Sequence, residues 1–238
     1  MPAFNPQTAP SRWALLLVDV QHDFVDGSLA VPGADRLQGP LSQLLSSSHF
    51  SQICATRDMH PADHISFAST HAGHEAFEEL DVPHPARGSV RQKLWPDHCV
   101  AGTRGAELLG VVKQGMQEAE QRGVECVEVH KGTDRQVDSY SGFVTAQDVL
   151  FSPLAAALFG AHVTRVLIAG VATDFCVRAT VLDACRFGLR PLVVLEACAG
   201  VEEAGTQRAV RELSEAGAEV VQSVEEALEK VQRDLQRA

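Results

Sequence analysis

One cysteine occupies a position where its thiolate form would be stabilised. In RVLIAGVATDFCVRATVLDACRFG, an apolar run reaches Gly170, and a helix is predicted to begin near Thr173 or Asp174, either of which can cap it. Cys176 then falls in the first helical turn, where unpaired N–H groups and the positive end of the helix dipole favour the nucleophilic thiolate. A buried, inert cysteine fits the same pattern, so Cys176 needs partners before it becomes a candidate nucleophile.

Two charged residues end apolar runs elsewhere in the chain. LLLVDVQHDF places Asp19 at the end of one run, and VECVEVHKGTDRQVDSYSGF places Lys131 at the end of another. A lysine at the end of a buried strand needs an anionic neighbour, because an unpaired ammonium group is costly to desolvate. Taken alone, Asp19 could cap a turn and Lys131 could be a solvated surface residue.

A third group of residues has the spacing of metal ligands. CATRDMHPADHISF places Asp58 and His60 two residues apart, so in an extended segment both side chains project to the same side. His64 follows, and WPDHCVAGT supplies His98 in the same loop-rich region. Mixed oxygen and nitrogen ligands suit zinc, iron or manganese. An Asp-x-His pair alone would fit a surface loop equally well.

These residues need a scaffold that brings distant segments together. Short apolar runs predict buried strands at 14–20, 53–56, 124–129, 163–169 and 191–195. Helical patterns cover 34–47, 105–121, 173–187, 201–216 and 224–236. Strands that alternate with helices predict an α/β fold with a parallel sheet flanked by helices, whose reacting groups gather at the carboxyl ends of the strands. Residues 59–103 break this alternation and are interpreted as a functional loop region.

Composition narrows the class of protein. The 238 residues are 45% hydrophobic, which is enough for a single domain over residues 1–238. The net charge of −11 argues against nucleic acid and anionic membranes as partners. No segment has the roughly 20 consecutive apolar residues of a membrane span, and the N-terminus lacks an apolar signal core, so we expect a cytoplasmic protein. The six cysteines form no CxxC pair and predict no disulfide framework.

Together these segments resemble the nicotinamidase branch of the isochorismatase-like cysteine hydrolases. The resemblance runs in order from about residue 14 to residue 200 and is carried by LLLVDVQHDF, TRDMHPADHISF, WPDHCVAGTRGAEL, HKGTDRQVDSYSGF and GVATDFCVRATVLDA. It implies a three-layer α/β/α fold with a parallel six-stranded sheet. It also implies a cis peptide bond between Val171 and Ala172.

The resemblance assigns a role to each candidate residue. It makes Cys176 the nucleophile, Asp19 the acid/base and Lys131 the third member of a catalytic triad, with the amides of Ala172 and Cys176 as the oxyanion hole. The implied ring-binding residues are Phe24, Trp95 and Tyr140. The implied ligands of one divalent metal ion, expected to be zinc with iron or manganese as alternatives, are Asp58, His60 and His98. His64 matches a position that ligates the metal in some relatives and not in others.

The activity implied by the resemblance is metal-dependent hydrolysis of nicotinamide to nicotinate and ammonia through a thioester, a step of NAD salvage. Two alternatives stay open: an isochorismatase-like amidohydrolase acting on another small amide, and a non-catalytic binding protein on the same scaffold. Relatives are often oligomeric, so a homo-oligomer is compatible with the resemblance, although no interface is recognisable in the sequence.

Overall fold

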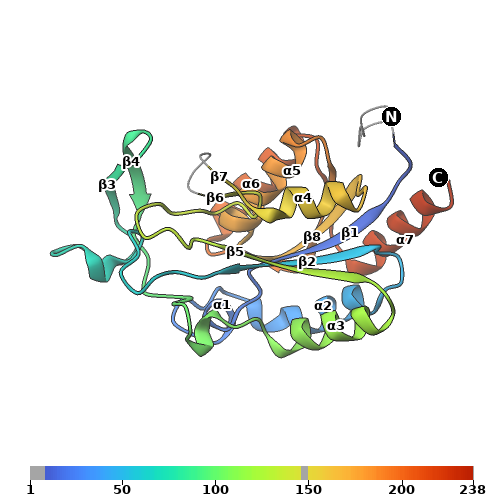
Figure 1. The fold of residues 1–238 in the computed structure, drawn as a ribbon, viewed down its shortest axis with the longest axis horizontal. Helices are drawn as coiled ribbons and strands as arrows, with labels where there is room; N and C mark the ends of the chain where they lie inside the picture. Colours follow the sequence, from blue (N-terminus) through green and yellow to red (C-terminus); the bar gives the residue numbers. More distant parts are fainter. Residues whose placement is uncertain (1–8, 146–149, 238) are drawn as a thin grey trace.

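A six-stranded parallel sheet forms the centre of the protein. The computed structural model describes residues 9–145 and 150–237 (Figure 1). The strand order is β10-β9-β8-β1-β2-β5, and every neighbouring pair is parallel. The strands are β1 (Trp13–Val18), β2 (Gln52–Asp58), β5 (Glu125–Lys131), β8 (Arg165–Val171), β9 (Arg190–Ala199) and β10 (Glu219–Val221).

Helices cover both faces of this sheet (Figure 1). One hydrophobic cluster joins the sheet to α2 (Gln38–Ser46), α3 (Gly110–Gln121) and α7 (Val224–Leu235). The other joins it to α4 (Pro153–Gly160), α5 (Arg178–Arg186) and α6 (Glu203–Glu215). The predicted three-layer α/β/α fold with a six-stranded parallel sheet is therefore confirmed.

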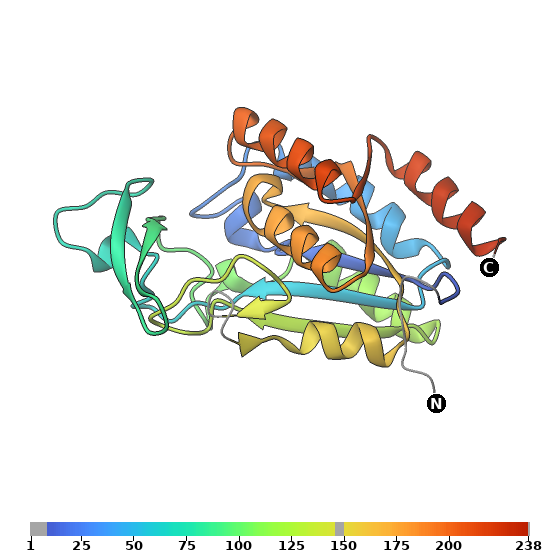
Figure 2. The ribbon, with the colours of Figure 1, turned by 90° about the horizontal axis from the view of Figure 1, so that it is seen from above.

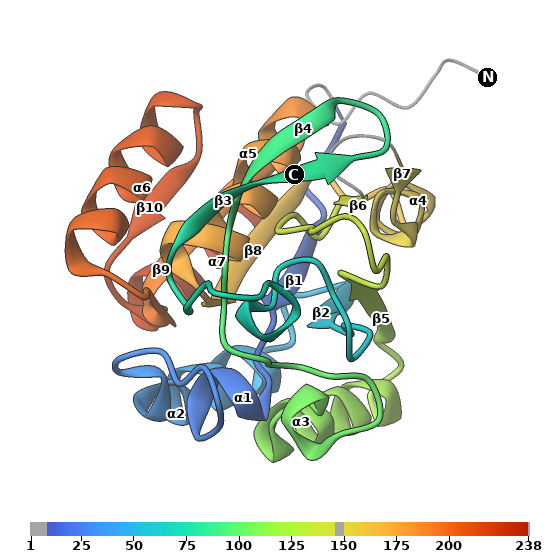
Figure 3. The ribbon, with the colours of Figure 1, turned by 90° about the vertical axis from the view of Figure 1, so that its left-hand side faces the viewer.

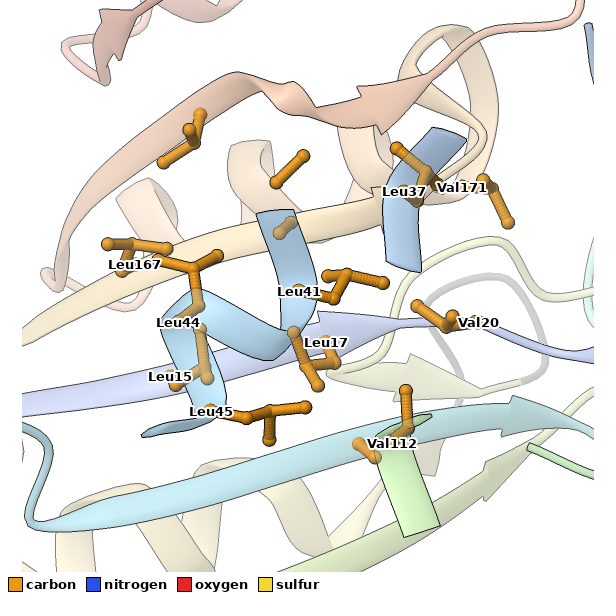
Figure 4. Packing of buried hydrophobic residues seen from close by; sticks show 14 of the residues in the cluster. Leu15, Leu17, Val20, Leu37, Leu41, Leu44, Leu45, Val112, Leu167 and Val171 are labelled. Atoms are coloured by element: carbon orange, nitrogen blue, oxygen red, sulfur yellow. The ribbon is translucent and has the colours of Figure 1, made fainter. Parts of the chain in front are cut away.

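Strand β1 shows why the apolar runs are continuous. Leu15 and Leu17 belong to the cluster that contains α2, and Figure 4 shows them facing Leu41 and Leu44 of that helix. Leu16 belongs to the cluster on the opposite face. All six residues of β1 are buried, because alternate side chains enter different layers and neither face meets water.

The loop region between β2 and α3 contains a hairpin that the sequence did not predict. Strands β3 (Glu79–His84) and β4 (Gly88–Lys93) pair in antiparallel register, apart from the main sheet. Figure 2 shows the hairpin beyond the carboxyl ends of β2 and β5, and Figure 3 looks directly at this end of the molecule. The hairpin therefore stands beside the strand ends that carry the candidate residues.

Several elements differ from the predicted ones. The predicted helix at 34–47 opens with a 3₁₀ turn, η1 (Ala34–Leu37). The predicted helix at 105–121 is instead a separate 3₁₀ turn, η3 (Arg104–Ala106), followed by three non-helical residues and then α3. The predicted helix at 173–187 is a π-helical turn, η4 (Thr173–Val177), followed by α5. The remaining short elements are α1 (His22–Val25), η2 (Ala68–Thr70), β6 (Val144–Thr145) and β7 (Leu150–Phe151). Helix α4 and strand β10 were not predicted. Among the described residues, no helix combines the length and apolar character that a bilayer crossing requires.

Candidate active site

Three of the predicted residues meet at the carboxyl edge of the sheet. Asp19 follows β1, Lys131 ends β5, and Cys176 lies in η4, just after β8. The Lys131 ammonium nitrogen lies 2.8 Å from Asp19 Oδ2 and 3.4 Å from Cys176 Sγ. Strand order explains this meeting, because β1 is flanked by β8 and β2, and β2 is flanked in turn by β5.

Asp19 is fixed by its neighbour on β2. The Thr56 hydroxyl donates to Asp19 Oδ1 at 2.7 Å, and the Asp19 amide donates to the Thr56 carbonyl at 3.2 Å. Asp19 has a positive φ of 50°, which turns the chain where the strand ends. Burial raises the pKa of Asp19 above its ordinary value, and the nearby Lys131 charge only partly opposes this effect. A carboxylate with a raised pKa is a better proton acceptor.

Lys131 is fully buried between two carboxylates. Its ammonium group lies 2.6 Å from Asp58 Oδ1 as well as 2.8 Å from Asp19 Oδ2, and it donates to the Ser139 carbonyl at 3.2 Å. Burial alone would lower the pKa of Lys131, but the charges of Asp19 and Asp58 outweigh it and hold the pKa well above the ordinary value. Lys131 is therefore a permanent cation.

The Cys176 sulfur faces these charged groups. It lies within 4.8 Å of carboxylate oxygens of Asp19 and Asp58. Burial raises the pKa of the Cys176 thiol, Lys131 lowers it, and the carboxylates, including a hydrogen bond with Asp19, raise it again. The resting group is thus a thiol beside a base. The stabilisation of the thiolate that the sequence analysis expected from the helix start is outweighed here by burial and by the neighbouring carboxylates.

A second cluster can hold a metal ion. One ligand atom from each of Asp58, His60 and His98 lies within 4.8 Å of the others, and all three residues are buried. His60 Nδ1 lies 2.8 Å from the Gly132 carbonyl, and His98 Nδ1 lies 2.8 Å from the Pro96 carbonyl. A carbonyl can only accept, so both Nδ1 atoms donate and both Nε2 atoms keep a lone pair for a metal.

His64 stands next to this cluster, together with a residue that the sequence analysis missed. Ligand atoms of His60, His64 and Asp138 also lie within 4.8 Å of one another. His64 Nε2 is buried without a hydrogen-bond partner, a feature that a nearby cation or its ligands would explain. Asp138 is buried and accepts a hydrogen bond from Gln92 at 2.8 Å. Its position in DSYSGF, after the strand that ends at Lys131, was the available signal.

A narrow pocket lies over both clusters. The predicted ring-binding residues Phe24, Trp95 and Tyr140 line it together with Cys176, and the Trp95 indole N–H donates to the Tyr140 hydroxyl at 3.1 Å. Five further lining residues were not predicted: Leu29, Val31, Asp138, Phe175 and Val201. The free volume is only about 30 Å³, far below the roughly 300–1,000 Å³ of typical ligand pockets. A ring can enter only if lining side chains shift.

Ala172 also lines the pocket, next to the nucleophile turn. The peptide bond between Val171 and Ala172 is cis, as the family resemblance implies. The Ala172 carbonyl accepts from the amides of Phe175 and Val177 at 3.0 Å each.

The expected capping role of Thr173 or Asp174 is wrong. The residue before the π-helical turn is Ala172, and no side chain caps the turn. The Asp174 carboxylate instead accepts from the amides of Val201 and Glu202, in the loop before α6. A partner 27 residues away along the chain cannot be inferred from local sequence patterns.

Comparison with known proteins identifies the same family that the sequence motifs resemble. The chain matches the isochorismatase domain over residues 13–225. It is 38% identical to a nicotinamidase of Acinetobacter baylyi over 212 residues, covering 88% of this chain and 92% of the relative.

Solved structures of similar fold belong to the same group of enzymes. The structure of the yeast nicotinamidase Pnc1p bound to the inhibitor nicotinaldehyde superimposes with a TM-score of 0.81 at 29% identity, covering 89% of this chain and 100% of that one. A pyrazinamidase of Pyrococcus horikoshii in complex with zinc has a TM-score of 0.67 at 32% identity, covering 89% and 99% of the two chains. The chain therefore belongs to the isochorismatase family, and within it to the amidohydrolases that resemble nicotinamidases.

Proposed function

We propose that the protein hydrolyses nicotinamide to nicotinate and ammonia in NAD salvage, with Cys176 as nucleophile, Asp19 as acid/base and Lys131 as the charge that balances the site. The observation that carries this proposal is the position of Cys176, on the wall of the narrow pocket, with its sulfur beside both charged groups. A cysteine with a base and a cation in contact is the arrangement that nucleophilic catalysis on an amide requires.

Asp19 starts the reaction by taking the Cys176 thiol proton as the sulfur attacks the carboxamide carbon. Lys131 stabilises the thiolate that develops, since its ammonium group lies 3.4 Å from the sulfur. Collapse of the tetrahedral intermediate breaks the carbon–nitrogen bond, and protonated Asp19 gives its proton to the leaving ammonia. Water then hydrolyses the thioester to nicotinate, with Asp19 taking a water proton that returns to the Cys176 sulfur.

Backbone amides supply the second element of catalysis. We assign the oxyanion hole to the N–H groups of Ala172 and Cys176, since both residues line the pocket and they belong to one tight turn. A donor of this kind contributes roughly 3 kcal/mol to transition-state stabilisation in comparable sites.

The residues around His60 fit a divalent metal. We propose Asp58, His60 and His98 as its ligands, with His64 as a further residue near the ion, because two free Nε2 lone pairs and a carboxylate converge and the buried His64 Nε2 lacks a partner. Zinc fits this donor set, and iron or manganese would also fit. When bound, the metal would supply a Lewis-acid position for the ring nitrogen of the substrate.

The aromatic side chains complete the substrate site. Phe24, Trp95 and Tyr140 line the pocket, and aromatic lining side chains suit a planar heteroaromatic amide. The wider predictions of a single domain, a cytoplasmic location and the absence of nucleic-acid and membrane partners stay predictions.

Ammonia release tests the proposal directly. The purified protein should release ammonia from nicotinamide and pyrazinamide, and Cys176→Ala should abolish release while nicotinamide still binds. Cys126→Ala is the matched control, because Cys126 lies near the start of β5, at the end of the strand away from Lys131, and burial raises the pKa of its thiol to about 11. Unchanged turnover by Cys176→Ala would refute the nucleophile assignment. Release of ammonia from other small amides, with none from nicotinamide, would favour the alternative amidohydrolase.

A further inference from the structure

Asp174 lies two residues before the nucleophile but takes no part in the proposed chemistry. Its carboxylate oxygens accept from the amides of Val201 at 2.9 Å and Glu202 at 3.0 Å. These two amides belong to the loop between β9 and α6, so Asp174 ties that loop to the turn that carries Cys176.

Two glycines allow this close approach. A Cβ added to Gly205 would lie 2.8 Å from Asp174 Oδ2, and one added to Gly200 would lie 3.3 Å from Oδ1 and 1.9 Å from the Thr206 hydroxyl. The loop is therefore built around the carboxylate. Because Glu202 is the residue before the first turn of α6 and makes no side-chain cap of its own, the Asp174 charge also meets the positive end of that helix.

The tied loop forms part of the pocket wall. Val201 lines the pocket together with Phe24 of α1 and Trp95 of the segment after the β3–β4 hairpin. A weaker tie reinforces the loop from outside: the Lys93 ammonium lies 3.6 Å from Glu202 Oε1 and sits 5.3 Å and 5.6 Å from the ring centroids of Trp95 and Phe175. Glu202 is largely exposed, so this ion pair contributes little, whereas the Asp174 bonds are charge-assisted and bind backbone.

The pocket thus has two kinds of wall. The aromatic walls are side chains that can rotate, as they must to admit a ring into so small a free volume. Val201, in contrast, belongs to a loop whose backbone is held at two points by one carboxylate.

We propose that Asp174 is a positioning residue that sets the substrate size of this enzyme, by fixing Val201 as the immobile wall of the ring pocket. This inference rests on the proposed function and extends it. We expect the fixed wall to favour single-ring amides over bicyclic ones, because a fused second ring needs more room between the pocket walls.

The central test is Asp174→Asn, which keeps the shape of the side chain but leaves one loop amide facing an NH₂ group instead of an acceptor. Loss of one charge-assisted bond should raise KM for nicotinamide on the order of tenfold with a smaller effect on kcat. It should also raise kcat/KM for quinoline-3-carboxamide relative to nicotinamide. Val201→Ala should shift this ratio in the same direction, and the double variant should shift it little further.

Glu196→Gln is the matched control, because Glu196 makes the same kind of bond, accepting from the Val224 amide at 2.8 Å at the start of α7, away from the pocket. It should leave KM and the ratio unchanged. A purely structural role for Asp174 would lower kcat in proportion to the active fraction, with KM and ratio as in wild type, and that outcome would overturn the inference. So would additive effects in the double variant.

A wrong proposed function can be distinguished from a wrong inference about Asp174. In that case wild type itself would release no ammonia from nicotinamide. The wall can still be tested by calorimetric binding of nicotinamide to Cys176→Ala and to Cys176→Ala combined with Asp174→Asn. The combined variant should bind on the order of tenfold more weakly, and equal affinities would overturn the inference.

Discussion

Replacing Lys131 with methionine should destabilise the folded protein far more than any surface charge change. The ammonium group is fully buried and contacts Asp19 and Asp58 at 2.8 and 2.6 Å. Removing one partner of a buried ion pair costs about 3–5 kcal/mol, because the remaining charge has neither water nor counterion. In a chain of this size that corresponds to a fall in melting temperature of roughly 6–20 °C.

The size of this effect should depend on pH. Burial already raises the pKa of Asp19, and without Lys131 that pKa must rise further. A carboxyl group with a raised pKa in the folded state binds a proton more tightly there than in the unfolded state. Stability is therefore lost as pH rises from the unfolded pKa, about 4, through the folded pKa. The difference between Lys131→Met and wild type should be largest at neutral pH and should shrink in acid.

Urea unfolding of metal-free protein, followed by circular dichroism over a range of pH, measures both effects. Lys113→Met is the control, because Lys113 pairs with Glu107 at 2.5 Å while both side chains are about half exposed. That pair should contribute about 0–1 kcal/mol. If Lys131→Met were no more destabilising than Lys113→Met at neutral pH, the buried ammonium could not be compensating the two carboxylates.

Three further predictions concern the site. Asp19→Asn should reduce kcat/KM for nicotinamide by roughly 100-fold or more in steady-state assays, since general-base catalysis contributes about 10²–10⁴-fold; activity within a factor of two of wild type would exclude Asp19 as the base. His60→Ala should lower bound metal below one ion per chain by elemental analysis, and chelated wild type should lose activity; full turnover in metal-free protein would refute a metal requirement. Gly132→Ala should also lose metal, because its Cβ would lie 2.3 Å from His60 Cε1, whereas Gly217→Ala, at another positive φ but with open space around it, should retain it.

Strands and site residues could be predicted for the same physical reason. Strands buried on both faces give continuous apolar runs, and a polar residue directly after such a run, such as Asp19, stands out. The family resemblance then supplied the roles that residue types alone left open. Elements whose sequences lack this contrast between apolar and polar residues were not predicted.

Helix α4 and the β3–β4 hairpin show the two ways in which the contrast fails. PLAAALFG is apolar on every side, so it has no helical period, although Ser152 caps it and Pro153 opens it as expected for a helix. The hairpin does alternate between exposed and more buried residues, but His84 and Gln92 occupy two of the buried positions, so only Leu80, Val82 and Val90 give an apolar signal. The hydrogen bonds of Asp174 could not be predicted for a third reason, because they join segments that lie far apart in the sequence.

The carbonyl groups that hold the rings of His60 and His98 have a consequence for work with this protein. Because Gly132 and Pro96 orient the two imidazoles through the main chain, the ligand frame belongs to the fold and does not depend on an ion to assemble it. Exchange of the ion should then need only access, not refolding. A cobalt(II) reporter could be loaded into native protein, and its visible absorption bands would follow events in the pocket during turnover.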